Sequence, residues 1–509
     1  MPLQAGSFDL AFRNHRAPSS FSFVHAMNLS FPIKKLSFLL PLVLLSACAS
    51  LSRDPLKSVR SQTSERLGYD VSATATAQDS ADVATRVSTQ LKRPLTADSA
   101  AQIALLNNRR LRATLEDVGI SQAEFVEAST PRNPTLASSV RLPRGGGKPN
   151  WEFNLAGDVL DALLIPMKRR IAGHNLVQTE RRVSHEILQL AAEARAAWFT
   201  LLASEQQLRK LQDIAGVNES VSDFAKRVHD AGNINDLELM ELQVGYQQVQ
   251  ADMKHGRAEV ETHRAKLNRL LGLSGAQAQW KLALNELPSL PSGDPSFAKA
   301  EAAALSQRQD LAAARAHVKA VEAVLALKRK TRFIPALNLG VDTERDPSGA
   351  QVTGPNLDIE LSLFNWGRAS VRKLEGELRQ AHALAEAIEA EVRNDVAANH
   401  AALRLAREAA EFQKATLLPQ RQSILKETLL HYNAMQKSNF ALLRAKDEEQ
   451  RAEKAAIESL RDYWLAWGDL EKAAGGSLSI KASIKPAPTK PVPAAKTDAA
   501  MSHEQHQKH

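Results

Sequence analysis

The side chains that are most capable of chemistry lie near the two ends of the sequence. Cys48 is the only cysteine, and it follows Leu45-Ser46-Ala47. Near the other end, His503, His506 and His509 recur at every third residue. Imidazoles on a flexible segment can capture copper, nickel or zinc, so these three residues are the candidate metal ligands. A solvated tail without a function is the alternative interpretation.

The residues before Cys48 resemble a bacterial lipoprotein signal. Lys34-Lys35 precedes an apolar run at 36–45, which is the order of a basic region and a short hydrophobic region before a signal-peptidase box. About ten apolar residues are too few to cross a hydrocarbon core of roughly 30 Å as a helix. The resemblance implies a signal peptide over residues 27–47, cleavage before Cys48 and a covalent lipid on its sulfur. We expect residues 1–26 to be a misassigned start.

No pattern in the sequence is typical of an enzyme. Gly145-Gly146-Gly147 lacks the following Lys-Ser or Lys-Thr of a phosphate-binding loop, and we interpret it as a hairpin loop. The sequence also shows no nucleophile elbow, zinc-ligand spacing or dinucleotide fingerprint. We therefore predict no catalytic residues, and no cofactor apart from the lipid on Cys48.

The composition favours long helices, because only 5% of the residues are aromatic while Ala, Leu, Glu, Arg and Gln are abundant. The net charge is +8, but Lys and Arg alternate with acidic residues along the chain, and we expect no single charged patch. Alternation of this kind is typical of solvated helix faces, so we expect no nucleic acid partner.

Residues 167–273 contain no proline, and their apolar side chains recur in steps of three and four. This spacing predicts a coiled-coil seam. A break at Ala231-Gly232-Asn233 divides the stretch into two antiparallel helices, of which the first has about 60 residues and a length of roughly 90 Å. We place the turn into this hairpin at Pro166. Helices of this length do not fit a small compact core.

The chain repeats this order of elements about 200 residues later. Residues 104–111 return as 304–311, and the break near His229 returns near His431. We therefore predict an internal duplication. Its parts are a lipidated tether or extended strap (48–95), a first repeat (96–290) with a helix over 97–128 and a hairpin over 167–273, a second repeat (291–474) with a hairpin over 368–470 that breaks near Pro419, and a disordered tail (475–509).

Each repeat contains two candidate strands, 135–143 and 150–160 in the first and 336–345 and 356–364 in the second. Their lengths suit tilted transmembrane strands, and ordinary soluble hairpins are the alternative. Four strands cannot close a barrel, and an open sheet edge in lipid would leave backbone groups unpaired. If the strands enter a membrane, several protomers must share one barrel, and three protomers would supply twelve strands.

These pieces together resemble the TolC-like outer membrane efflux proteins, particularly their lipoprotein members. The resemblance covers about residues 95–474 and is carried by Leu95-Thr96, by Gln309-Asp310-Leu311, by the motif at 363–368 after the last strand and by the motif at 229–234. It implies a mainly α fold with a small β part, in which long antiparallel coiled-coil hairpins form an α-helical barrel across the periplasm. Four strands per protomer would join the transmembrane β-barrel of a homotrimer in the bacterial outer membrane.

The resemblance further implies an efflux channel that conducts substrate passively from a periplasmic adaptor and an inner membrane transporter. A lipid-anchored periplasmic adaptor or coiled-coil scaffold, or the outer membrane component of a type I secretion system, stays open as the alternative.

The resemblance assigns adaptor docking and the gate to the two hairpin tips. Relatives carry a glycine and nearby acidic residues at the second tip, whereas this chain has Ala441 and Arg444 at the acid-matching places. An acidic ring would therefore have to come from the first repeat, and an arginine near the aperture would make it less cation-selective. The candidate tip residues are Gly232, Asn233, Ile234, Asp236, Glu238 and Glu241 in the first repeat, and Met435, Gln436, Ala441 and Arg444 in the second.

Overall fold

The computed structural model describes residues 54–71, 77–145, 148–345 and 348–478. Cys48 and the three C-terminal histidines lie outside these ranges, as do residues 1–26 and the signal at 27–47. The lipidation and metal-binding hypotheses therefore stay predictions.

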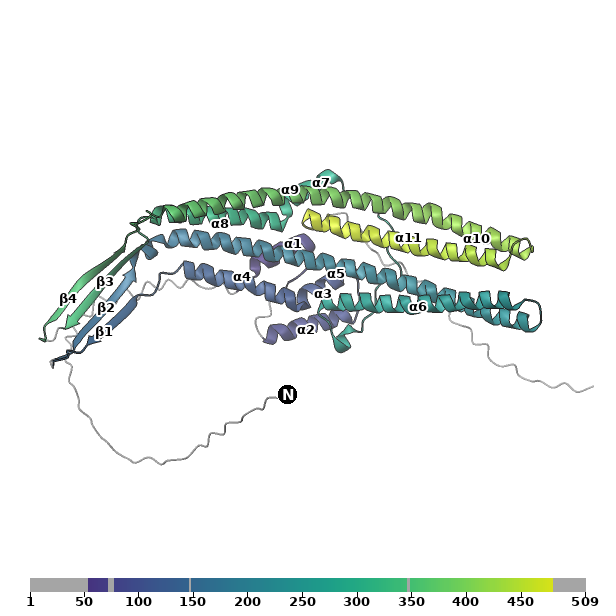
Figure 1. Ribbon diagram of the computed structural model, residues 1–509, viewed down its shortest axis with the longest axis horizontal. Helices are drawn as coiled ribbons and strands as arrows, with labels where there is room; N and C mark the ends of the chain where they lie inside the picture. The colour runs from purple at the N-terminus through teal and green to yellow at the C-terminus, as the bar shows by residue number, and fades with distance from the viewer. Residues whose placement is uncertain (1–53, 72–76, 146–147, 346–347, 479–509) are drawn as a thin grey trace, which may run out of the picture. The chain divides into compact units, whose positions relative to one another are not determined.

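The described chain is mainly helical with one small sheet, as predicted, and its two halves have the same order of elements (Figure 1). The first half contains α3 (Ala97–Asn107), α4 (Arg109–Ala128), β1 (Thr135–Arg141), β2 (Asn150–Asp158), α5 (Val159–Asp230) and α6 (Asp236–Leu271). The second half contains α7 (Phe297–Gln307), α8 (Gln309–Thr331), β3 (Ala336–Arg345), β4 (Gln351–Glu360), α9 (Arg368–Phe412), a π-helical turn (Gln413–Leu417), α10 (Leu418–Asn433) and α11 (Asn439–Ala474). The helix predicted over 97–128 is interrupted at Asn108, whose side chain caps α4.

The prediction of an extended strap before residue 95 is wrong over its described part. Two helices lie there, α1 (Lys57–Leu67) and α2 (Ala77–Leu91). Val83 and Val87 are one helical turn apart on α2, and both are buried against the core. α1 has little amphipathic periodicity, whereas α2 is strongly amphipathic, and packing against the rest of the protein stabilises both helices.

Two prolines that were expected to separate helices do not interrupt the helical course of the chain. Pro166 is within α5, which has 72 residues and a length of about 108 Å. Pro419 stands at the start of α10, directly after the π-helical turn. A proline has no N–H for the carbonyl four residues earlier, and the wider turn before Pro419 accommodates this loss.

The four strands form one antiparallel sheet in the order β1-β2-β3-β4. The two repeats meet at its centre, where Leu155 of β2 pairs with Val341 of β3. β4 begins earlier than predicted and ends at Glu360, because its pairing with β3 already starts at Gln351 opposite Arg345. β1 and β4 are the edges, and neither has a second neighbour within the described ranges.

The long helices follow the lateral order of the strands. α5 is central and packs against α4 and α6 of its own repeat and against α8 and α11 of the other. α9 packs on α8 and α11 and forms the opposite margin (Figure 1). Asp158 is the last residue of β2 and also the N-cap of α5, since its side chain accepts a hydrogen bond from the Asp161 N–H at 2.8 Å. The sheet therefore continues into α5 without a loop.

The main core lies midway along the helices. The linker between the repeats, residues 272–296, is bound to it. Trp464 donates its ring N–H to the Pro288 carbonyl at 2.9 Å. Arg407 of α9 binds both carboxylate oxygens of Asp294 in the linker, and Tyr463 donates its hydroxyl to the same carboxylate at 2.8 Å. We call this region the waist.

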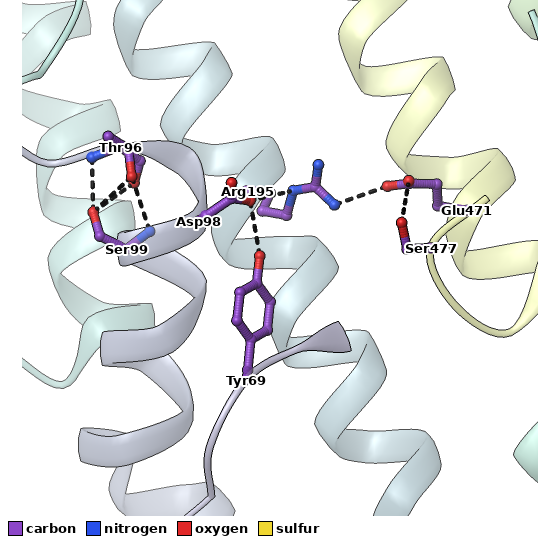
Figure 2. Close-up of polar contacts among 7 residues, drawn as sticks. All are labelled: Tyr69, Thr96, Asp98, Ser99, Arg195, Glu471 and Ser477. Carbon is purple, nitrogen blue, oxygen red and sulfur yellow. Dashed lines mark hydrogen bonds and ion pairs between the residues drawn. The ribbon is translucent and has the colours of Figure 1, made fainter. Parts of the chain in front are cut away.

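A charge network joins four separate segments at the waist (Figure 2). Arg195 of α5 lies 2.8 Å from Glu471 of α11 and 3.7 Å from Asp98 of α3, and the Tyr69 hydroxyl donates to Asp98 at 2.8 Å. Burial favours the neutral form of Arg195, but Glu471, Tyr69 and Asp98 outweigh that effect, so the pKa of Arg195 lies above its ordinary value. The network therefore stabilises the junction of the two repeats with the N-terminal segment.

We expect Arg195→Met to lower the free energy of unfolding by about 3 kcal/mol, because the Glu471 carboxylate would stay buried without its partner. The measurement is helix signal against denaturant for the detergent-solubilised protein. Ser477→Ala is the control, since Ser477 makes only a long hydrogen bond of 3.4 Å to Glu471. Equal stabilities of Arg195→Met and the control would contradict a stabilising role for the pair.

Candidate functional site

The sheet exposes its apolar face. Along β2, Trp151, Phe153 and Leu155 are 45–48% exposed, while Glu152 and Asn154 between them are half-buried. A sheet in water normally buries the apolar face and exposes the polar one. Contiguous exposed apolar surface of this kind marks contact with a membrane or with a partner. The same face continues over the other strands as Leu136, Val140, Leu339, Val341, Leu357 and Ile359.

The opposite face of the sheet is polar and acidic. Glu152 of β2 stands directly opposite Glu344 of β3 in the register. Glu152 accepts hydrogen bonds from Ser139 at 3.0 Å and from Arg141 at 3.3 Å, and Glu344 accepts one from Asn150 at 2.6 Å. Further carboxylates on this face are Asp158, Asp342, Asp358 and Glu360. Such a face suits water and cations.

The first tip turns between α5 and α6 at Gly232, whose φ of 75° is in the left-handed region. The Gly232 N–H donates to the His229 carbonyl at 2.8 Å. The Nε2 atom of His229 lies 2.7 Å from the Asp236 carboxylate, which links the end of one helix to the start of the next. Of the other candidate residues at this tip, Ile234 and Glu238 are half-buried, and Asn233 and Glu241 are exposed.

The second tip has the same backbone turn without a glycine. Met435 takes the place of Gly232, with a φ of 59° and an N–H that donates to the Tyr432 carbonyl at 2.8 Å. A left-handed conformation costs a residue with a side chain about 1–2 kcal/mol. Gln436 accepts or donates a hydrogen bond at 2.6 Å to His431. The missing glycine therefore does not change the turn.

Ala441 and Arg444 lie in the first turns of α11. The Ala441 N–H donates to the side chain of the N-cap Ser438 at 3.3 Å. Arg444 forms an ion pair with Glu448 at 3.3 Å, and Glu448 also binds Arg421 of α10. The charge of Arg444 is thus partly balanced within its own hairpin.

Sequence reasoning missed that each hairpin contains one helix-weakening residue at the matching position between the waist and its tip. Gly216 in α5 and Pro419 in α10 each stand sixteen residues before the left-handed residue of their tip. A Cβ at Gly216 would meet no atom within 4 Å, so packing does not require glycine there. Glycine and proline both weaken a helix interior. Aligning the repeats on the tips would have revealed the match.

The His229–Asp236 contact predicts a pH dependence of the first tip. The hydrogen bond to Asp236 raises the pKa of His229 in the folded tip. The contact is therefore fully present below the ordinary histidine pKa of about 6.5 and is lost as the pH rises through the higher, folded-state value. We expect stronger amide protection at residues 229–238 below pH 6.5 than above pH 8 in hydrogen exchange corrected for intrinsic rates.

Asp236→Asn is the control for this experiment and should lose most of the pH difference. An unchanged difference in that variant would assign the effect to another group.

No helix in the described ranges combines the length and the hydropathy needed to cross a membrane. Across the same ranges, no group of three or more His, Cys, Asp and Glu residues is placed to hold a metal ion.

Comparison with known protein families gives a match in the second half of the chain. Residues 302–476 match the family model described as outer membrane efflux protein. No functionally curated protein matches the sequence with significance.

Solved structures resemble the chain over both halves. A structure of CusC has a TM-score of 0.62 and 17% identity, covering 75% of this chain and 92% of its own. A membrane protein from Pseudomonas aeruginosa has a TM-score of 0.64 and 19% identity, covering 74% and 93%. The CmeC outer membrane channel of Campylobacter jejuni has a TM-score of 0.61 and 14% identity, covering 80% and 89%.

At these identities the solved structures establish the fold, and the family model establishes the kinship of the second repeat. The family consists of passive channels rather than enzymes. Residues 302–476 therefore belong to the outer membrane efflux protein family, and the described chain as a whole has the fold of solved outer membrane channels.

Proposed function

We propose that three copies of this outer membrane efflux channel form one conduit, which carries substrate passively from a periplasmic adaptor and an inner membrane pump to the exterior. The observation that carries the proposal is the sheet, which has an exposed apolar face and two unpaired edges. Its strands of 7 to 10 residues are close to the length that a tilted transmembrane strand needs. In lipid, the edges must pair with another copy.

The lateral order of the protomer supports a closed ring. β1 and the helices α4 and α6 lie at one margin, and β4 with α9 and α10 lies at the other. Each margin therefore differs from the other in both the sheet and the helices. Copies that join unlike margins form a ring when the rotation closes. Twelve strands from three copies would place the apolar faces toward lipid and the acidic faces toward the lumen.

The fold favours a channel over the rival periplasmic adaptor. We expect an adaptor to carry one helical hairpin within small β domains, whereas this chain has two hairpins and a four-stranded sheet in one body. The lumen would supply a water-filled path without bond chemistry. The covalent lipid on Cys48 would add a second attachment to the membrane.

Gating is proposed to occur beyond the waist. The linker and the Arg407–Asp294 pair bind the helices there, whereas Gly216 and Pro419 weaken both hairpins nearer the tips. An adaptor that binds the open tips more tightly than the closed tips would shift the population toward the open state. The docking surface would include the tip residues named above.

Planar-bilayer conductance of the purified protein, together with an unheated denaturing gel, tests the proposed function. Small and mostly closed channel events from a detergent-resistant trimer are the expected result. A monomer without conductance that still binds an inner membrane transporter would favour the adaptor instead.

Cysteine cross-linking tests the sharing of the sheet. Within one protomer β1 and β4 are separated by three strand spacings, or about 14 Å, which no disulfide can bridge. We expect Ser138→Cys on β1, combined in turn with Thr353→Cys, Leu357→Cys or Ile359→Cys on β4, to form covalent trimers in at least one combination. The background is Cys48→Ser with a cleavable signal, and the single-cysteine variants are controls. Only monomers in all combinations would contradict a shared barrel.

The acidic face predicts a preference for cations in the sheet-lined part of the conduit. We expect Glu152→Gln with Glu344→Gln to shift the reversal potential in a salt gradient toward zero, since carboxylates lining the path attract cations. The matched control is Glu386→Gln with Glu391→Gln, which removes two exposed carboxylates from α9 outside the sheet. An equal shift in the control would show that the sheet does not determine selectivity.

A further inference from the structure

A local excess of positive charge lies where the helices meet the sheet. Segments 161–170, 328–332 and 368–373 contain ten Lys and Arg residues and a single acidic residue, Asp161. These three segments together carry a net charge of +9. This local excess was not singled out from the sequence. We call the three segments the basic collar.

The three segments of the collar lie next to the same end of the sheet. α5 begins directly after β2, α8 ends shortly before β3, and α9 starts shortly after β4. α8 packs between α5 and α9, so the sheet-proximal ends of these helices are neighbours (Figure 1). The collar therefore borders the ends of the strands.

Carboxylates within the described chain balance only part of the collar. Lys168 contacts Asp161, and Arg329 lies 2.8 Å from Glu375. Lys373 lies 3.6 Å from a glutamate one turn along α9. Five exposed cations have no carboxylate partner among the residues described, and they are Arg169, which lies over the Phe125 ring, and Arg170, Lys330, Arg368 and Arg372.

Helix dipoles explain only one of the three segments. Lys328, Arg329 and Lys330 stand in the last turn of α8, where cations are favourable. Arg368 is the first residue of α9, where the dipole disfavours a cation, and the first turn of α9 has no acidic residue. Lys168, Arg169 and Arg170 lie more than two turns into α5, beyond the reach of its dipole. The helix dipoles therefore supply no compensating negative charge to the cations of α5 and α9.

Exposed aromatic rings accompany the collar at the turn into α9. Trp366 and Phe333 are 54% and 45% exposed, and their rings meet edge to face with centroids 6.1 Å apart. The Arg332 guanidinium lies 4.3 Å from the Phe333 ring centroid. Gly367 fixes this turn, because a Cβ there would come within 2.6 Å of the Arg332 carbonyl. Aromatic rings and cations beside an apolar sheet are typical of a membrane interface.

We propose that the basic collar binds the phosphodiester headgroups of anionic glycerophospholipids in the leaflet on the helical side of the sheet. The proposal rests on the proposed function, since the sheet must lie in the membrane for the collar to reach the headgroups. Charge complementarity identifies the ligand, because the collar has unpaired guanidinium and ammonium groups and anionic headgroups lie at this level. Guanidinium groups also suit phosphate oxygens, which they bind through two parallel hydrogen bonds.

Lipid retention tests the proposal. The full-length protein is reconstituted in phosphatidylcholine containing a minority of phosphatidylglycerol, extracted in mild detergent, and its retained phospholipids are quantified by mass spectrometry. We expect enrichment of phosphatidylglycerol over its share of the mixture, decreasing with ionic strength. The variant Arg170→Gln/Lys330→Gln/Arg368→Gln/Arg372→Gln should reduce the enrichment by at least about tenfold. The matched control removes four exposed cations far from the sheet, as Arg227→Gln/Lys254→Gln/Lys426→Gln/Lys437→Gln, and should keep it.

Two outcomes would overturn the lipid site. One is equal enrichment in the collar variant and the unmodified protein. The other is a changed ion selectivity of the collar variant with unchanged lipid retention, which would place the collar on the conduit. Conductance in pure phosphatidylcholine distinguishes a failure of this proposal from a failure of the proposed function. The unmodified protein and the collar variant should both conduct there, and absence of conductance from both would contradict the channel itself.

Discussion

The unpaired hydrogen-bonding edges of β1 and β4 constrain the rest of the structure. A sheet with its apolar face exposed is stable in a membrane, but its edge N–H and C=O groups would then be unsatisfied in lipid. One protomer of four strands cannot remove this cost. The duplication provides a protomer whose two margins differ, since β1 belongs to the first repeat and β4 to the second. The helices show the same difference between margins. Asp158, which ends β2 and caps α5, joins the sheet directly to these helices.

Helices of this length need a region that holds them together, and the waist has that role. Aromatic residues, the Arg195–Glu471 pair and the bound linker fix the helices there. Toward the tips each hairpin depends mainly on contacts between its own two helices. Gly216 and Pro419 lie in this less restrained part, at equal distance from their tips. The repeats therefore combine a rigid middle with ends that can change their packing at low cost.

The features that the sequence predicted are those with local or repeated patterns. The hairpin over 167–273 followed from its periodicity, and the strands followed from alternation beside long helices. The helices α1 and α2 were missed, because α1 has little periodicity, and because α2 has few apolar residues and the burial of Val83 and Val87 depends on distant segments. Pro166 was misplaced, since the N-cap at Asp158 starts α5 before the proline. The tip positions were identified, but the contact of His229 with Asp236 depends on the three-dimensional turn.

The collar and the acidic face place opposite charges on either side of the same boundary. Ten cations stand where the helices begin or end, while six carboxylates lie on the polar face of the adjoining strands. Ion pairs between the two groups would be the simplest explanation, but of these carboxylates only Glu152 has an ion pair among the described residues, and its partner Arg141 lies on the sheet. The separation instead fits two different surroundings, a water-filled lumen for the acids and a headgroup layer for the cations. Opposite charges on the two surfaces would also keep the sheet at one depth, because moving it along the membrane normal would take the collar away from the phosphates.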